Sequence, residues 1–332
     1  MNRFEIVTPT DLAHATRLLA RENTMAIAGG VDILDLLKMD VAAPTRLVNL
    51  KELKELDGID VKSDGSLRVG ALAKVGTIAD HPTIKERFTA ISEAAENAAT
   101  PQIRNLATAG GNLTQRPRCW YFRNPDTVCL RKGGKTCFSI AGLNRYHAIL
   151  GGGPSFIVHP SNLAPALIAF RASVQISGPN GARTIDLERF FTLPTVDPHR
   201  ENVLVPGEIV TAILIPKPPE NARSNYIEVR EKQSFDWPLV SAAAMVATVG
   251  SNSKEVRDAR VVMGAVAPIP WRSAAAEDAI KGHPLDVARA RDAAEAALKP
   301  AIPMSDNAYK VRIAKVVVRR AILKAAGIEE VA

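Results

Sequence analysis

The 332-residue sequence is poor in cysteine, and its odd number of three speaks against a disulfide framework and for free thiols or metal ligands. It has no apolar run close to the roughly 18 to 20 residues that a membrane-spanning helix needs, so no membrane span is expected. The N-terminal segment 1–7 alternates like a β-strand and lacks the apolar core and cleavage site of a signal peptide. The sequence therefore predicts no export signal of its own.

Signatures of several other protein classes are missing as well. The net charge is +7, but Lys and Arg are scattered and no nucleic-acid recognition motif accompanies them. We therefore expect no nucleic-acid partner, and a moderately basic subunit that docks an acidic partner explains the surplus. No acid–base triad and no carboxylate pair stands out, so no catalytic residue is predicted.

Two double-glycine turns follow apolar stretches about 80 residues apart, the first at Ala28–Ile33 and the second at Thr108–Asn112. Glycine lets backbone N–H groups approach a ligand because no Cβ stands in the way. Two such turns suit a diphosphate held from both sides, and the ligand that this suggests is a dinucleotide, which contains a diphosphate. Neither turn reads G-x-G-x-x-G, so a Rossmann fold is disfavoured, and a plain tight turn is the alternative for each.

The C-terminal third reads as a separate domain. Residues 217–221, Lys-Pro-Pro-Glu-Asn, indicate a linker. Beyond it, apolar patterns predict strands and then helices, at 239–249 and 257–266 for the strands and at 273–281, 284–298 and 306–325 for the helices. This order favours a small sheet covered by helices.

All three cysteines, Cys119, Cys129 and Cys137, fall within one span of 19 residues. Their spacing lacks the close C-x2-C pairs of zinc ribbons and ferredoxins but is compatible with a loop around an iron–sulfur cluster. Basic residues in the same stretch would offset the charge of such a cluster: Arg116, Arg118, Arg123, Arg131, Lys132 and Lys135. A four-iron cluster needs a fourth ligand, for which His147 is the first candidate, ahead of His159, Asp126 and Ser155. The alternative is that the thiols pack as small hydrophobic side chains.

Several motifs together resemble a known family. Residues 28–34 and 108–113 resemble the two flavin motifs of the FAD-binding (medium) subunits of molybdenum hydroxylases, which are xanthine dehydrogenases, carbon monoxide dehydrogenases and aldehyde oxidoreductases. His159–Asn162 resembles a third motif, usually written with Asp where this chain has Asn162, and 206–210 and 226–245 also match. The resemblance covers essentially the whole chain. It implies an α+β protein, with a two-subdomain FAD-binding fold of the PCMH/vanillyl-alcohol-oxidase type followed by a C-terminal small sheet with helices.

The resemblance also implies how the chain is divided. We expect an FAD-binding domain over 1–219, with subdomains of about 1–56 and 57–219, and a C-terminal flavin-subunit domain over 222–328. A cysteine-bearing insert at 114–150 resembles the branch whose flavin subunit carries an additional [4Fe-4S] cluster, such as bacterial three-subunit aldehyde oxidoreductases and hydroxybenzoyl-CoA reductases. The latter supply four cysteines and this chain only three. The implied metal ligands are Cys119, Cys129, Cys137 and, as a non-cysteine ligand, His147.

By the same resemblance, both glycine turns bind the pyrophosphate of FAD. The expected backbone donors are Ala28, Gly29, Gly30, Val31, Gly110 and Gly111, and Ile33 and Ala109 belong to the same turns. The expected side-chain partners are Asp32, Thr108, Asn112 and Ser161. Leu163, Phe191 and Lys232 are expected near the isoalloxazine.

The resemblance finally implies partners for an electron-transfer subunit. A large subunit with molybdenum cofactor would oxidise an aldehyde or heterocycle, and a small subunit with [2Fe-2S] centres would pass electrons to FAD on this chain. The external acceptor would be NAD, ferredoxin, a quinone or dioxygen. The expected location is cytoplasmic, or periplasmic by co-export with a signal-bearing partner. Two rival hypotheses are a stand-alone FAD-dependent oxidoreductase with its own substrate pocket and a flavin-free, zinc-binding assembly subunit.

Overall fold

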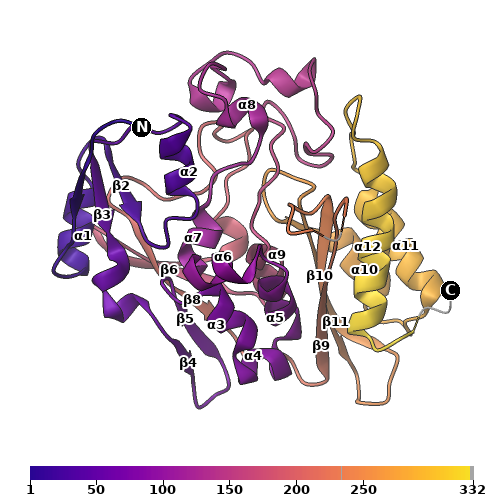
Figure 1. The fold of residues 1–332 in the computed structure, drawn as a ribbon. Helices are drawn as coiled ribbons and strands as arrows, with labels where there is room; N and C mark the ends of the chain where they lie inside the picture. Colours follow the sequence, from indigo (N-terminus) through magenta and orange to yellow (C-terminus); the bar gives the residue numbers. More distant parts are fainter. Residues whose placement is uncertain (233, 330–332) are drawn as a thin grey trace.

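The computed structural model describes residues 1–232 and 234–329 and contains three β-sheets with helices packed against them (Figure 1). The sheets follow the chain across the molecule, from the N-terminal strands on one side to the C-terminal helices on the other (Figure 1). Each sheet carries its own part of the core, and the candidate site lies between the first two.

The N-terminal unit is a parallel sheet in the order β1-β3-β2. Its strands are β1 (Glu5–Val7), β2 (Thr24–Ile27) and β3 (Arg46–Asn49), and its helices are α1 (Leu12–Leu19) and α2 (Ile33–Lys38), followed by the 3-10 turns η1 (Leu50–Glu52) and η2 (Lys54–Leu56). The first glycine turn joins β2 to α2 and therefore lies at the carboxyl edge of a parallel sheet, where such folds bind ligands.

The central unit is a five-stranded antiparallel sheet in the order β4-β5-β8-β6-β7. Its strands are β4 (Ile59–Val61), β5 (Leu67–Gly70), β6 (Ser173–Gly178), β7 (Gly181–Asp186) and β8 (Ile209–Ile215). Its helices are α3 (Val75–Asp80), α4 (Pro82–Arg87), α5 (Thr89–Glu96), α6 (Pro101–Leu106), α7 (Ala109–Thr114) and α9 (Leu163–Ala169), with the 3-10 turn η5 (Leu187–Arg189). The second double glycine is thus the first turn of α7, with the Thr108 hydroxyl as its N-cap.

The C-terminal unit is an antiparallel sheet in the order β12-β11-β10-β9, covered by helices as the sequence predicts. The strands are β9 (Ala222–Val229), β10 (Val240–Thr248), β11 (Val256–Gly264) and β12 (Trp271–Arg272), and the helices are α10 (Ala274–Ile280), α11 (Val287–Leu298) and α12 (Tyr309–Ala325). Across the part of the chain that the structure describes, no helix is both long and apolar enough to cross a membrane.

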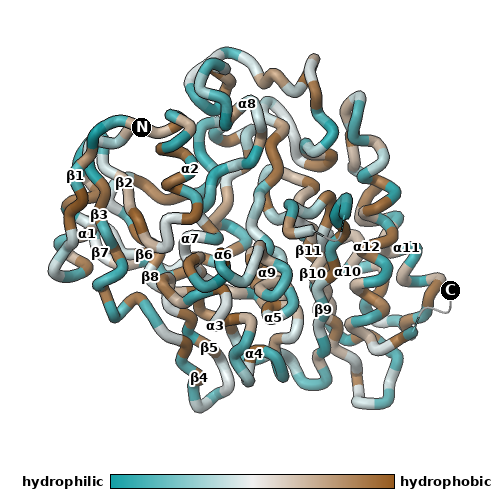
Figure 2. Tube along the Cα trace, in the orientation of Figure 1, coloured by the Kyte–Doolittle hydropathy of each residue, from teal (hydrophilic) through white to brown (hydrophobic). Residues whose placement is uncertain are grey.

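Strand β10 is apolar along almost its whole length because both of its faces are buried. Ala242, Ala244 and Val246 belong to the core formed with α11 and α12, whereas Ala243 and Met245 belong to the core of the central unit. This two-residue alternation is that of a strand between two packed layers. On the outer layer, α12 alternates hydrophobic and hydrophilic residues along its length (Figure 2). The C-terminal and central units therefore share one sheet as a common wall.

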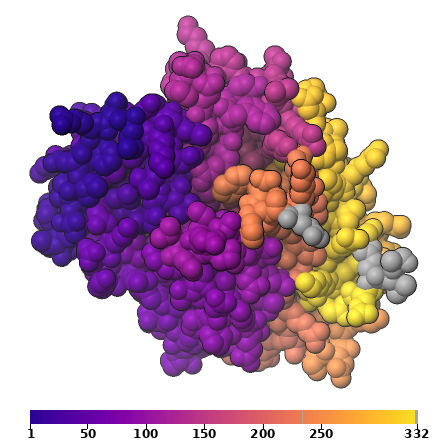
Figure 3. All heavy atoms as spheres, in the orientation of Figure 1, coloured from indigo at the N-terminus to yellow at the C-terminus, as the bar shows by residue number. Residues whose placement is uncertain are grey.

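The cysteine insert has little regular structure and forms a lobe between the first and last units, drawn in magenta in Figure 3. Its only helical turns among the described residues are α8 (Trp120–Arg123), η3 (Leu130–Lys132) and η4 (Phe138–Ile140). The buried Lys310 of α12 holds its end, since the Nζ donates to the carbonyl oxygens of Tyr146 (3.3 Å), His147 (3.1 Å) and Ala265 (2.6 Å). The insert is thereby fixed to the C-terminal unit.

Candidate functional site

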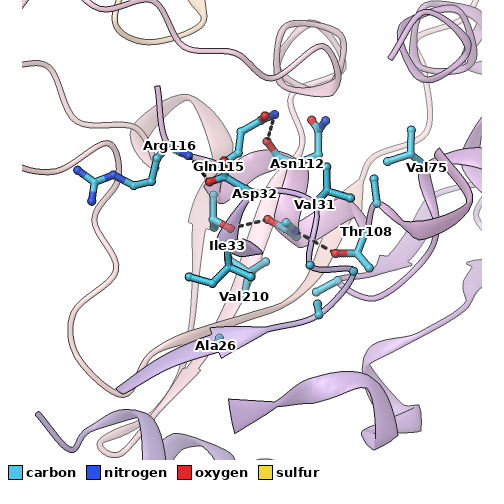
Figure 4. Close-up of a pocket in the computed structure, with 18 of the residues that line it drawn as sticks. Ala26, Val31, Asp32, Ile33, Val75, Thr108, Asn112, Gln115, Arg116 and Val210 are labelled. Atoms are coloured by element: carbon cyan, nitrogen blue, oxygen red, sulfur yellow. Dashed lines mark hydrogen bonds between the residues drawn. The ribbon is translucent and has the colours of Figure 1, made fainter. Parts of the chain in front are cut away.

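One cavity of about 580 Å³ is lined by both glycine turns, although they lie about 80 residues apart in the chain. Its lining contains most of the predicted flavin residues, namely Ala28, Gly29, Gly30, Val31, Asp32, Ile33, Thr108, Gly110, Gly111 and Asn112. Figure 4 shows Val31 and Asp32 from the first turn beside Thr108 and Asn112 from the second. The volume is in the range of about 300 to 1,000 Å³ usual for ligand sites.

The two segments touch at Gly29, which packs against the backbone of Leu106. A Cβ on Gly29 would lie 2.8 Å from the carbonyl carbon of Leu106 and nearer still to its oxygen, closer than real Cβ atoms approach. Gly30 is required for a different reason, because its φ of +78° is a conformation that side-chain-bearing residues rarely adopt. The glycines of the first turn thus allow close backbone contact and a left-handed bend.

The glycine N–H groups that are free of partners lie on the first turn. Among the described residues, no acceptor pairs with the N–H groups of Gly29, Gly30 or Val31. In contrast, the Gly110 N–H donates to the Ala71 carbonyl (2.8 Å), and the Gly111 N–H donates to the Thr108 hydroxyl (3.3 Å). The second turn therefore forms a wall of the cavity, while the first offers hydrogen-bond donors for an anion.

Asp32 uses its carboxylate to hold the cysteine insert. Its Oδ2 accepts the Arg116 N–H (2.8 Å), and its Oδ1 accepts from the guanidinium groups of Arg118 and Arg123 (2.7 Å to Arg123). These bonds span more than 80 residues of chain. Although Asp32 lines the cavity, its charged group is engaged by the protein itself.

Asn112 and Ser161 also bond to each other. The Ser161 hydroxyl donates to Asn112 Oδ1 (2.5 Å) and accepts the Ala164 N–H (3.0 Å) at the start of α9. This pair connects α7 to α9 across 49 residues. This hydrogen bond fixes the part of the cavity wall that Asn112 forms.

Five of the predicted residues lie outside the lining of this cavity. Ala109, Leu163 and Phe191 are buried in the core of the central unit, and Phe191 packs edge-on against His159 at 4.6 Å between ring centroids. Ser161 lines a neighbouring cavity, and Lys232 is exposed. The isoalloxazine neighbours predicted from the resemblance are therefore not gathered at the cavity.

The lining also contains residues that the sequence reasoning did not assign to the site. They come from seven other stretches of the chain and include Leu50, Leu56, Ala71, Leu72, Ala98, Ala99, Ile103, Arg104, Arg116, Arg118, Asn162, Ile209, Val210 and Trp237. The motif residues Asn162 and Ile209–Val210 carried a signal, because they lie in blocks that matched the family. Apolar wall residues such as Leu56, at the end of η2, carried none, since a buried leucine there looks like any core leucine in sequence.

A second cavity of about 240 Å³ adjoins the first, with Arg118 and Trp237 lining both. The Arg118 guanidinium lies over the Trp237 ring at 4.8 Å from its centroid. The lining of this second cavity also contains Cys119 and His147 of the insert. The insert therefore lines the flavin-motif cavity through Gln115, Arg116 and Arg118, and Arg118 with Trp237 also lines the second cavity.

The predicted metal ligands come together only in part. Cys119 Sγ lies 3.3 Å from His147 Nε2, whereas Cys137 Sγ bonds to the Ser139 hydroxyl (3.0 Å) and Cys129 is packed in an apolar cluster. Burial raises the pKa of Cys119 to about 11, with smaller contributions from the thiols of Cys137 and Cys129. Across the described ranges, no three Cys, His, Asp or Glu side chains form a metal-binding group.

The imidazole of His147 is suited to bind a metal in its neutral form. Burial and the charge of Lys310 lower the pKa of His147 to about 4, so the ring is neutral at pH 7. His159, one of the other candidates, is likewise held neutral, since burial and nearby Arg131 lower its pKa to about 3. It lies apart from the thiols, against Phe191.

The basic residues of the insert are largely paired with carboxylates. Arg131 and Arg116 both bind the buried Glu201, at 2.8 Å and 2.6 Å, and Arg118 and Arg123 bind Asp32. That these arginines also offset the charge of a cluster stays a prediction. Their ion pairs bind the insert to the N-terminal and central units.

Two known families match this chain in succession. The family described as FAD binding domain in molybdopterin dehydrogenase matches residues 2–218, and the CO dehydrogenase flavoprotein C-terminal domain matches residues 225–325. The aldehyde oxidoreductase FAD-binding subunit PaoB of Escherichia coli (strain K12) is 35% identical over 292 residues, covering 87% of each chain. The carbon monoxide dehydrogenase medium chain of Hydrogenophaga pseudoflava is 26% identical over 328 residues, covering 96% of each.

The solved structures agree in fold. A carbon monoxide dehydrogenase structure from Hydrogenophaga pseudoflava matches with a TM-score of 0.77 and 25% identity over 98% of both chains. The expected mixed fold, an FAD-binding part followed by a small sheet with helices, is thereby confirmed. The chain belongs to the family of FAD-binding flavoprotein subunits of molybdenum hydroxylases, which are components of oxidoreductases.

Proposed function

We propose that this chain is the electron-transfer subunit of a three-subunit aldehyde-oxidising molybdenum hydroxylase. The observation that carries the proposal is the single cavity lined by both flavin motifs. The aldehyde assignment rests on the 35% identity to an aldehyde oxidoreductase subunit. The partners would be a large subunit with molybdenum cofactor and a small subunit with [2Fe-2S] centres, and an external acceptor would take the electrons.

The residues present fit FAD. Gly29, Gly30 and Val31 offer unpaired N–H groups to the pyrophosphate. The backbone of Gly29 lies so close to the carbonyl of Leu106 that no Cβ fits between them. Apolar residues such as Leu56 close one part of the cavity, which suits the adenine. Bound FAD accepts electrons one at a time and releases them singly or in pairs, whereas the chain supplies position and electrostatics.

The test uses the purified complex and the isolated chain. We expect both to contain about one FAD, and we expect aldehyde to bleach the flavin absorbance only in the complex. Turnover of any substrate by the isolated chain would support the stand-alone oxidoreductase instead. A colourless chain that contains zinc and no flavin would support the assembly-subunit hypothesis.

We further propose that the insert binds a [4Fe-4S] cluster through Cys119, Cys129, Cys137 and His147. In support, all three cysteines lie in the one lobe formed by the insert, and His147 Nε2 already lies 3.3 Å from Cys119 Sγ. The cysteines would have to leave their present hydrogen bonds and packing to converge on iron. Such a cluster would supply a one-electron centre beside the flavin cavity.

Iron content decides this second proposal. Anaerobically purified protein is expected to contain about four irons per chain. His147→Ala should lose the iron and keep FAD, whereas the control His199→Ala, on an exposed loop, should keep both. Unchanged iron in His147→Ala would refute the ligand assignment, and no iron in the wild-type protein would refute the cluster.

A further inference from the structure

The amide of Asn162 is oriented by two buried acceptors behind the flavin-motif cavity. Asn162 lines the cavity at the start of α9 and is only 5% exposed. Its Nδ2 donates to the Glu228 carboxylate (2.9 Å) and to the Tyr226 hydroxyl (3.3 Å). Because an asparagine amide has donors at one end and an acceptor at the other, this leaves Oδ1 as the polar atom for the cavity.

Glu228 is itself held rigidly. Its side chain is 5% exposed, its Oε2 also accepts the Tyr226 hydroxyl (2.9 Å), and its Oε1 pairs with Arg230. Two donors thus converge on Oε2, an arrangement that suits a carboxylate, which accepts hydrogen bonds and donates none. Glu228 does not contribute to the lining of the cavity, so any influence on a ligand passes through Asn162.

The hydrogen bonds of Arg230 show which part of the cavity lining this network supports. Arg230, besides binding Glu228, donates to the carbonyls of Asn97 and Ser234. Asn97 immediately precedes the lining residue Ala98, and Ser234 leads to the lining residue Trp237. The network therefore lies behind the part of the wall that contains Trp237, which is 46% exposed, whereas the lining residues Leu50 and Leu56 are buried.

We propose that Glu228 is a positioning residue, which makes Asn162 a hydrogen-bond acceptor for the imide N–H of the isoalloxazine. This assignment rests on the proposed function. It places the redox-active ring beside the exposed Trp237 and the adenine beside the buried leucines. An isoalloxazine ring in that position lies next to the solvent-exposed part of the cavity lining at Trp237, where an external acceptor can take its electrons.

The experiment compares FAD with an analogue that lacks the imide proton, N3-methyl-FAD, in titrations of the flavin-depleted complex. The wild type should bind FAD about tenfold more tightly than the analogue, the usual effect of one hydrogen bond. In Glu228→Gln, the new amide can donate to Asn162, so the Asn162 amide can reverse. The selectivity ratio should then fall close to one, with a change in the flavin's visible spectrum. The same substitution at the exposed Glu220 should leave the ratio unchanged.

A second substitution separates positioning from folding. Asp presents acceptors whichever way it is turned, so Asn162→Asp added to Glu228→Gln should restore the preference for FAD. If Glu228 had only a structural role, a second substitution in the same buried network would not restore the preference for FAD over the methyl analogue. If wild-type protein binds FAD but does not discriminate against the methyl analogue, or if Glu228→Gln retains full discrimination, this inference is wrong. Failure to bind FAD at all would instead refute the proposed function.

Discussion

Replacing Gly29 by alanine tests the contact on which the cavity depends. The added Cβ would lie 2.8 Å from the Leu106 carbonyl carbon and closer to its oxygen, against a practical minimum of 3.0 Å. Both neighbours are backbone, so no side chain can rotate out of the way. The first turn and the α6–α7 junction must therefore separate by several tenths of an ångström or more. Since the φ of Gly29 is not positive, alanine brings no backbone strain of its own.

Over-packing of this kind costs about 1 to 3 kcal/mol. If FAD binds only the form in which the two segments are in contact, binding must supply this cost, which corresponds to a loss of about 5- to 150-fold in affinity. The assay is titration of flavin-depleted protein with FAD, with urea unfolding of the apo-protein in parallel. The matched control is Gly250→Ala, where an added Cβ meets no atom within 4 Å. Wild-type FAD affinity in Gly29→Ala would refute the argument that the two motifs are in contact through Gly29.

Three further predictions concern buried polar residues in and around the insert. Asp32→Ala, which deprives two guanidinium groups and one N–H of an acceptor, should cost about 3 kcal/mol of unfolding free energy and speed proteolysis within the insert. Lys310→Met, which leaves three carbonyls without their donor, should cost about 2 to 4 kcal/mol in urea unfolding. Acid should destabilise the apo-protein, because the pKa values of His147 (about 4) and His159 (about 3) lie below the unfolded value of about 6.5. Stability is then lost as pH falls through 6.5 toward 4, by about 4 kcal/mol between pH 7 and pH 5, and His159→Gln should halve that slope.

The parts of the site that depend on local backbone were predictable from sequence. Gly29 and Gly30 stand between an apolar strand and a helix, so the turn follows from the residues themselves. The long apolar run at 240–248 likewise predicts a buried strand, although only the structure shows that two different cores bury it. The sequence predicts a turn at the second glycine pair, but the Thr108 cap makes this pair the beginning of a helix.

The roles of individual polar groups were not predictable, because each is set by a partner far away in the chain. Gly110 lines the cavity as expected, yet its N–H is taken by Ala71. Asn162 was noticed only as a departure from the motif, and its orientation depends on Glu228, 66 residues later. Motif patterns predict where a backbone bends, whereas the direction of each donor and acceptor is a property of tertiary packing.

The pairing of Asp32 gives the insert a direct connection to the flavin site. The same residue that begins α2, directly after the free donors Gly30 and Val31, accepts from Arg116, Arg118 and Arg123 of the insert. A shift of the insert that strained these bonds would move the turn that faces the cavity, and a ligand that fixed the turn would steady the insert. Because linkage is reciprocal, Asp32→Ala should weaken FAD binding and loosen the insert together. Loss of only one of the two, measured by FAD titration and by proteolysis of the same variant, would show that the turn and the insert are independent.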